Sequence, residues 1–130
     1  NKEVLEKGLH AIKIAADSGV TICFGTDLLG KLHFAQSREF GLRSQVQSSL
    51  DVLRSATINA ARMLRQEKFL GQVSPGFAAD LLILNANPLE DITILDVPEK
   101  HVLATIKDGR VHASRWSKLQ TDLNRTVNIA

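Results

Sequence analysis

The chain has 130 residues, of which 44% are hydrophobic and 23% are charged, and its formal net charge is +2. This composition is typical of a folded globular protein and excludes intrinsic disorder. The 16 basic and 14 acidic residues are interspersed, so no basic stripe predicts binding to nucleic acid. No segment has the roughly 20 apolar residues that cross a bilayer, and we therefore expect no membrane partner.

The amino terminus reads Asn1-Lys2-Glu3 and does not begin with methionine. We therefore expect the chain to be an interior or carboxy-terminal segment of a longer protein. Its first residues lack the basic-then-apolar order of a signal peptide, which favours a cytoplasmic location. A targeting segment upstream of Asn1 would change that expectation.

Residues 3–18 carry apolar side chains at helical spacing, and Gly19 follows where a left-handed cap would end a helix. The next run, 20–26, is apolar and β-branched, which predicts a parallel strand buried on both faces. Helix, glycine turn and strand form one αβ step of a parallel sheet. Cys23 lies within this run, so we expect a buried free thiol. The apolar positions of the helix are Leu5, Leu9, Ile12 and Ala16.

The predicted strand ends in Gly25, Thr26 and Asp27. An unpartnered carboxylate cannot lie in the core of a buried strand, but it fits the carboxyl end, where α/β sheets and barrels place catalytic side chains. There it can bind a cation or accept a proton from water. We therefore predict that Asp27 is the catalytic residue. The alternative is a carboxylate that only caps the following loop.

Residues 28–37 have a polar and irregular pattern, and loops that leave the carboxyl end of a strand usually form the rim of an active site. His33 lies in this stretch and is a candidate substrate contact, although loop histidines are more often simply solvated. Residues 38–46 are predicted to be helical. Ser48 and Asp51 then have the spacing of a capping box. This box predicts a helical region at 49–65, formed by one helix or by two abutting ones.

The sequence pattern changes from helix to strand after residue 70. Ser74-Pro75-Gly76 predicts a turn, and residues 79–84 predict a strand. Asp108-Gly109 lies between two apolar runs and predicts a β-hairpin, so we expect the second half to be a small β-unit. The strands of the hairpin are expected at 102–107 and 110–113.

Asp80 opens the first of these strands directly after a turn, where a carboxylate commonly accepts backbone N–H bonds. We therefore interpret Asp80 as structural and not catalytic. In the tail, the spacing of Trp116, Leu119 and Leu123 predicts a short helix that packs on the surface.

Several motifs along the chain together resemble the amidohydrolase superfamily, and more narrowly its branch of imidazolonepropionase-like and Xaa-Pro-dipeptidase-like enzymes. They occur in the family's order and at its usual spacing across roughly residues 3–113. One such motif would be weak, whereas several in series are specific. The motifs are Phe24–Asp27, Leu53–Arg62, Leu70–Leu81, Asn87–Ile92 and Ile106–Val111.

The resemblance implies an α/β fold, namely the last αβ step of a distorted (β/α)8 metallo-hydrolase barrel followed by the C-terminal part of a small β-sandwich. Asp27 corresponds to the family's strand-eight aspartate, which contacts a metal and carries the proton of the attacking water. The implied cofactor is a divalent metal, as one or two zinc ions. The implied division is the end of the barrel at 1–69, sandwich strands at 70–113 and a C-terminal tail at 114–130.

The family's other ligands, a His-x-His pair, a bridging carboxylated lysine and two later histidines, have no counterpart here. The resemblance therefore implies that a preceding part of the protein supplies them and that this chain alone is inactive. It implies the C-terminal segment of a metal-dependent amidohydrolase that hydrolyses an amide-type C–N bond in a small molecule or dipeptide. We expect a homo-oligomer or association with the rest of the barrel. The histidines of the chain are His10, His33, His101 and His112.

Two hypotheses in which the chain is not part of an enzyme stay open at this point. The segment could be a structural or interaction remnant that keeps the amidohydrolase scaffold. It could also be an unrelated small β-domain that binds a ligand, but that reading leaves the Gly-Thr-Asp strand end unexplained.

Overall fold

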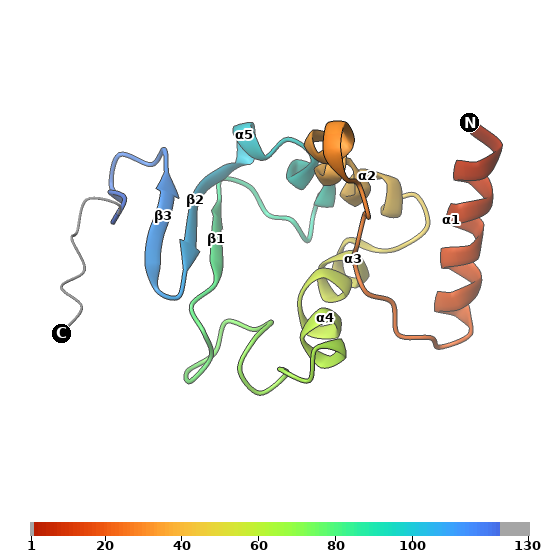
Figure 1. The fold of residues 1–130 in the computed structure, drawn as a ribbon, viewed down its shortest axis with the longest axis horizontal. Coiled ribbons are helices and arrows are strands. Elements are labelled where there is room, and N and C mark those ends of the chain that lie inside the picture. Colours follow the sequence, from red (N-terminus) through yellow and green to blue (C-terminus); the bar gives the residue numbers. More distant parts are fainter. Residues whose placement is uncertain (1, 123–130) are drawn as a thin grey trace.

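The computed structural model describes residues 2–122, in which two end regions flank a central group of short helices (Figure 1). Helix α1 lies at one end of the molecule and a three-stranded sheet lies near the other. No helix of this range is long and apolar enough to cross a membrane. The elements, with η for a 3₁₀ helix, are α1 (Lys2–Asp17), η1 (Gly30–Arg38), α2 (Glu39–Arg43), α3 (Ser49–Ala56), α4 (Ile58–Met63), β1 (Leu81–Leu84), η2 (Ile92–Asp96), α5 (Pro98–His101), β2 (Val102–Lys107) and β3 (Arg110–Ser114).

Helix α1 forms where the sequence predicts it and ends before Gly19, whose φ of +74° suits a glycine cap. Ion pairs between residues one turn apart support the helix locally. No other helix or strand within residues 2–122 packs extensively against α1, and its Val4 and Ile14 side chains are more than half exposed. The ion pairs are Glu3–Lys7 at 2.7 Å and Lys13–Asp17 at 3.0 Å.

The strand predicted at 20–26 does not form. Residues 20–29 have no strand ladder in the structure. A parallel strand needs neighbouring strands along its edges. The sheet of the described chain consists of β1, β2 and β3 only. The segment is held instead by single contacts to the helices, with Phe24 N donating to the Ser55 carbonyl at 3.0 Å and the Asn59 amide donating to the Ile22 carbonyl at 2.9 Å.

The lack of partner strands also changes the burial of this segment. Val20 is 58% exposed, although the sequence predicts a strand buried on both faces. Cys23 is a free thiol, as expected, but it is only partly buried. Burial on both faces needs a layer of structure on each side of the strand, and the described residues do not supply it.

The segment after Asp27 is more regular than its sequence pattern indicates. Residues Gly30–Arg38 form the 3₁₀ helix η1 where an irregular loop is expected, and α2 follows it directly. Helix α2 ends at Arg43, with hydrogen-bonded turns continuing to Gln47, so the helix predicted at 38–46 is confirmed in part.

The predicted capping box is confirmed in part at the start of α3, because the Ser48 cap forms but the Asp51 carboxylate bonds to the Ser48 hydroxyl and not to its backbone N–H. The Ser48 hydroxyl accepts from Asp51 N at 3.2 Å and donates to the Asp51 carboxylate at 2.6 Å. The helical region predicted at 49–65 consists of two abutting helices, α3 and α4. They separate at Thr57, which has φ −123° and ψ −88°.

The hydrophobic core joins α3 to η2. One polar contact fastens α2 to the same cluster, because Gly41 N donates to the Asp96 carboxylate at 2.8 Å. The core residues are Val52, Ile92, Ile94 and Leu95, with Phe24, Phe40, Leu53 and Leu84 packed against them.

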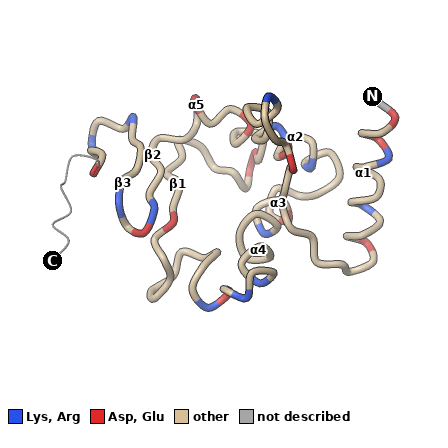
Figure 2. The backbone as a smooth tube through the Cα atoms, in the orientation of Figure 1, with Lys and Arg blue, Asp and Glu red and all other residues tan. Residues whose placement is uncertain are grey.

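The β-unit predicted for the second half is a sheet of order β1-β2-β3 with antiparallel pairing. Asp108 and Gly109 have φ values of +49° and +76°, as a tight mirror-image hairpin turn requires, so the predicted hairpin is confirmed. The turn at Ser74-Pro75-Gly76 is also confirmed, with Phe77 N donating to the Ser74 carbonyl at 3.1 Å. Figure 2 shows Lys and Arg interspersed with Asp and Glu along the chain.

The described part of the tail, 115–122, forms turns and not the predicted helix. Leu119 N donates to the Trp116 carbonyl at 2.9 Å, which closes a single turn. Asp122 then bonds to both backbone groups of Val111, each at 2.9 Å. These bonds bring the chain back beside β3 and so compete with helix formation. Leu123 lies outside the described residues.

Candidate functional site

Asp27 lies where the sequence predicts the site, at the end of the extended segment and just before η1. Its φ of +51° falls in the left-handed region, which aspartate tolerates better than most residues. The side chain is exposed, and it forms no hydrogen bond or ion pair with any residue of 2–122. A carboxylate without a protein partner is free to bind a cation or to exchange a proton.

A pocket of about 300 Å³ opens beside the end of this segment, where the sequence predicts the end of a strand, and is called the strand-end pocket below. The Phe24 and Phe40 rings are stacked within it, with centroids 4.4 Å apart and an interplanar angle of 27°. Asp27 is not among the residues that line the pocket, but its neighbour Thr26 is. The lining residues are Phe24, Gly25, Thr26, Gln36, Ser37 and Phe40.

A buried cation supports the aromatic pair of this pocket. Arg43 is only 6% exposed, and its guanidinium carbon lies 5.0 Å from the centroid of the Phe24 ring. Glu39 accepts from Arg43 Nε at 2.6 Å and pairs with Nη2 at 2.5 Å. The ion pair and the aromatic face offset the cost of desolvating the guanidinium. Arg43 Nη1 has no hydrogen-bond partner in the described chain.

His33 lies on η1 and is exposed. It precedes Gln36 by three residues, so the two share one ridge of the 3₁₀ helix, but His33 itself does not line the strand-end pocket. The structure therefore keeps His33 near the predicted rim without bringing it into contact with Asp27.

The described residues do not by themselves fit a complete metal centre. Within 2–122, no three side chains of His, Cys, Asp or Glu come close enough together to hold an ion. A catalytic zinc site normally has three protein ligands. Asp27 can supply one ligand, so the remaining ligands have to come from outside the described residues.

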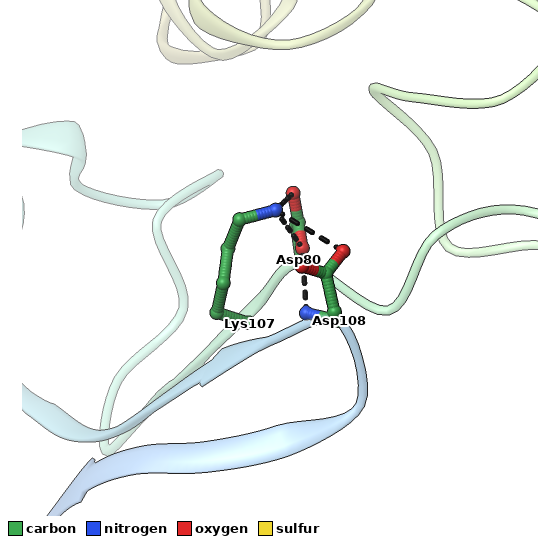
Figure 3. Close-up of polar contacts among 3 residues, drawn as sticks. All are labelled: Asp80, Lys107 and Asp108. Atoms are coloured by element: carbon green, nitrogen blue, oxygen red, sulfur yellow. Dashed lines mark hydrogen bonds and ion pairs between the residues drawn. The ribbon is translucent and has the colours of Figure 1, made fainter. Parts of the chain in front are cut away.

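Asp80 is structural, as predicted, and the hairpin turn provides its partners (Figure 3). Its carboxylate accepts from Asp108 N at 2.9 Å and from Lys107 Nζ at 2.8 and 3.0 Å. The Lys107 hydrogen bond and then the Asp108 backbone bond hold the pKa of Asp80 below its usual value. Lys107 Nζ also donates to the Asp108 carboxylate at 3.2 Å. Its hydrogen bonds to the Asp80 and Asp108 carboxylates raise the pKa of Lys107.

The sequence model of the Amidohydrolase family matches residues 1–112, which is most of the chain. The chain belongs to the amidohydrolase family. The resemblance drawn from the motifs is thereby confirmed. Proteins of this family have a (β/α)8-barrel fold, and they generally use a divalent metal cofactor.

Individual relatives of this amidohydrolase agree with the family assignment. Ochratoxinase of Aspergillus niger is 34% identical over 104 residues, which cover 79% of this chain and 22% of that protein. A crystal structure of an amidohydrolase has a TM-score of 0.80 at 40% identity, covering 82% of this chain and 26% of its own. A prolidase complexed with N-methylphosphonate-L-proline has a TM-score of 0.79 at 39% identity, covering 85% of this chain and 27% of its own. The chain thus spans about a quarter of the length of these relatives.

Sequence reasoning missed the part of the site formed by η1 and α2. Glu39 and Arg43 are four residues apart, and this spacing alone could have indicated an ion pair on a helix. Its burial over Phe24 could not be inferred, because it depends on how α2 meets a segment nearly twenty residues earlier in the chain. Gln36 and Ser37 carry no sequence signal that distinguishes them from other polar loop residues.

Proposed function

We propose that this chain is the C-terminal segment of a metal-dependent amidohydrolase that hydrolyses an amide-type C–N bond in a small molecule or dipeptide. The observation that carries the proposal is Asp27, a carboxylate that pairs with no residue of 2–122 and lies at the end of an extended segment in an amidohydrolase-family chain. In this proposal residues 1–69 complete the barrel, 70–113 belong to a β-sandwich and 114–130 form the tail. The three-stranded sheet is consistent with the second part.

Asp27 has two roles in the proposed reaction. Its carboxylate contributes one ligand to a divalent metal, which we propose to be zinc and which lowers the pKa of bound water when present. The carboxylate also accepts the proton of the attacking water and delivers it to the leaving amine. Its exposure and the absence of a partner within residues 2–122 support both roles, since its oxygens are not already taken up by another side chain of that range.

The substrate class is supported by the names of the relatives. The structure of a prolidase with bound N-methylphosphonate-L-proline is similar to 85% of this chain. We propose that His33, exposed on η1 beside the predicted rim, contacts the substrate.

The unpartnered N-terminal region supports a further part of the proposal, namely association. The apolar side chains of α1 and the ladder-free segment 20–29 offer surfaces that need covering. We propose that the remaining strands of the barrel pair with the edges of this segment and cover α1, or that the protein forms a homo-oligomer.

The experiment compares the complete protein with the 130-residue chain produced alone. We expect the complete protein to hydrolyse N-acyl amino acids or dipeptides, to lose activity with a chelator and to regain it with zinc. The chain alone should bind zinc no more tightly than micromolar and should show no amidase activity, because one ligand does not hold a catalytic metal. A complete protein that binds no metal and cleaves no amide would favour the non-catalytic remnant. A monodisperse 130-residue monomer that binds zinc tightly would refute the barrel argument.

A further inference from the structure

The strand-end pocket has a rigid aromatic floor. Phe24 and Phe40 stack on each other and also pack against the hydrophobic core. Arg43 and Glu39 fix the Phe24 ring from the buried side. The floor is therefore held by the core and by a buried ion pair, so its shape does not depend on a mobile side chain.

The rim of the pocket offers polar groups that have no other role in the described structure. The Gln36 amide and the Ser37 hydroxyl form no hydrogen bond with any residue of 2–122. The Thr26 hydroxyl accepts only a long bond of 3.4 Å from Leu28 N. These side chains can form hydrogen bonds with a ligand without breaking hydrogen bonds within the described part of the protein.

None of the described residues that line the pocket is charged. Arg43 lies beneath the floor, but its charge is balanced by Glu39 at 2.5 Å. A charged ligand group in the pocket would lose hydration against two phenyl rings without gaining a counter-charge. A neutral apolar group, with or without one polar end, would gain contact with the rings and hydrogen bonds from the rim.

We propose that the strand-end pocket is the specificity subsite of the enzyme and binds the neutral side chain of a substrate residue that flanks the scissile bond. The inference rests on the proposed function, because Thr26 in the pocket wall is the neighbour of Asp27. Gln36 is the residue that sets the preference for neutral side chains. Its exposed position on η1 allows its charge to be changed without disturbing the core.

The test uses the complete protein and two sets of dipeptides. The sets place phenylalanine, lysine or glutamate on either side of the scissile bond and alanine on the other. In one of the two sets, we expect kcat/KM for phenylalanine to exceed that for lysine and glutamate by at least about tenfold. Gln36→Glu should shift the lysine-to-phenylalanine ratio about tenfold toward lysine, and Gln36→Lys should shift the glutamate-to-phenylalanine ratio similarly toward glutamate.

The matched control is Gln45→Glu, the same change at an exposed glutamine outside the pocket, and it should leave every ratio unchanged. Active Gln36 variants whose ratios equal those of the parent would overturn the subsite and leave the proposed function intact. A uniform fall in all rates with a lowered melting temperature would overturn it too, because it would mean that protein fills the pocket. If the unsubstituted enzyme with zinc cleaves no dipeptide of either set, the subsite and the proposed amide hydrolysis both fail.

Discussion

The N-terminal region, residues 2–29, and the sheet region, residues 79–114, differ in how many of their hydrogen-bonding and packing partners lie within the same region. In the sheet region a tight turn joins β2 to β3, β1 pairs with β2 across the connection 85–101, and the Asp80–Lys107 ion pair lies beside the turn. The N-terminal region has a well-formed helix but an apolar strand segment without a ladder. An antiparallel hairpin joins residues that are close in sequence, at little cost in loop-closure entropy. A parallel strand forms only when strands far away in the sequence pair with it.

The carboxylates of the two regions also differ in their contacts. Asp27, in the less self-sufficient region, is exposed and unpaired among the described residues, whereas Asp80, in the sheet region, is held by Lys107 and by a backbone amide. The comparison therefore predicts that one carboxylate matters for turnover and the other for stability. Substitutions in both regions can break or sharpen this division.

The largest expected effect is on turnover, at Asp27. In the complete protein, Asp27→Asn keeps the shape of the side chain but removes most of its proton affinity. We expect kcat to fall by at least roughly 100-fold with an unchanged melting temperature. Asp17→Asn, which removes an exposed carboxylate of α1, serves as the control and should leave kcat unchanged. Near-normal turnover of metal-loaded Asp27→Asn would refute the assignment.

The next effect concerns the connection between the helices and the sheet region. Gly71 and Gly76 both have φ of +88°, but a Cβ at Gly71 would lie 2.9 Å from the Thr57 carbonyl oxygen and 2.9 Å from Ala61 Cβ, whereas Gly76 faces open space. Gly76→Ala should cost about 1–2 kcal/mol through backbone strain alone. Gly71→Ala should cost about 1–3 kcal/mol more, because steric overlap is added. Urea unfolding of the complete protein measures both, and equal losses would contradict the close approach.

The smallest effect is expected at Asp80. Asp80→Asn should lower the melting temperature at neutral pH by a few degrees and leave kcat close to normal, because the carboxylate holds the hairpin and is not part of the site. Glu67→Gln, an exposed change between the two regions, is the control. A large loss of kcat at an unchanged melting temperature would contradict the structural role.

The pH dependence of this difference follows from the pKa shifts. The pKa of Asp80 is lowered in the folded state, so its stabilisation is present above its ordinary pKa of about 4 and is lost as pH falls through the folded value. The pKa of Lys107 is raised, so its stabilisation is present below about 10.4 and is lost as pH rises through the folded value. The melting-temperature difference between the parent and Asp80→Asn should therefore be largest between these limits.

The sequence by itself determined the elements whose signals are local. The glycine cap after α1, the Ser48 hydroxyl cap of α3 and the Asp108-Gly109 turn all follow from short-range chemistry, and each is present in the structure. The position of Asp27 at the end of an apolar segment also follows from the sequence, because the apolar run stops at this carboxylate.

Only the tertiary structure decided what depends on residues far apart in the sequence. The run at 20–26 reads as a buried strand, but it forms no ladder without neighbours. The strand-end pocket exists because η1 and α2 fold back over Phe24 and place the Arg43–Glu39 pair beneath its ring. Packing between residues far apart in the sequence decides which side chains are buried and which strands pair. A local sequence pattern does not specify those distant partners.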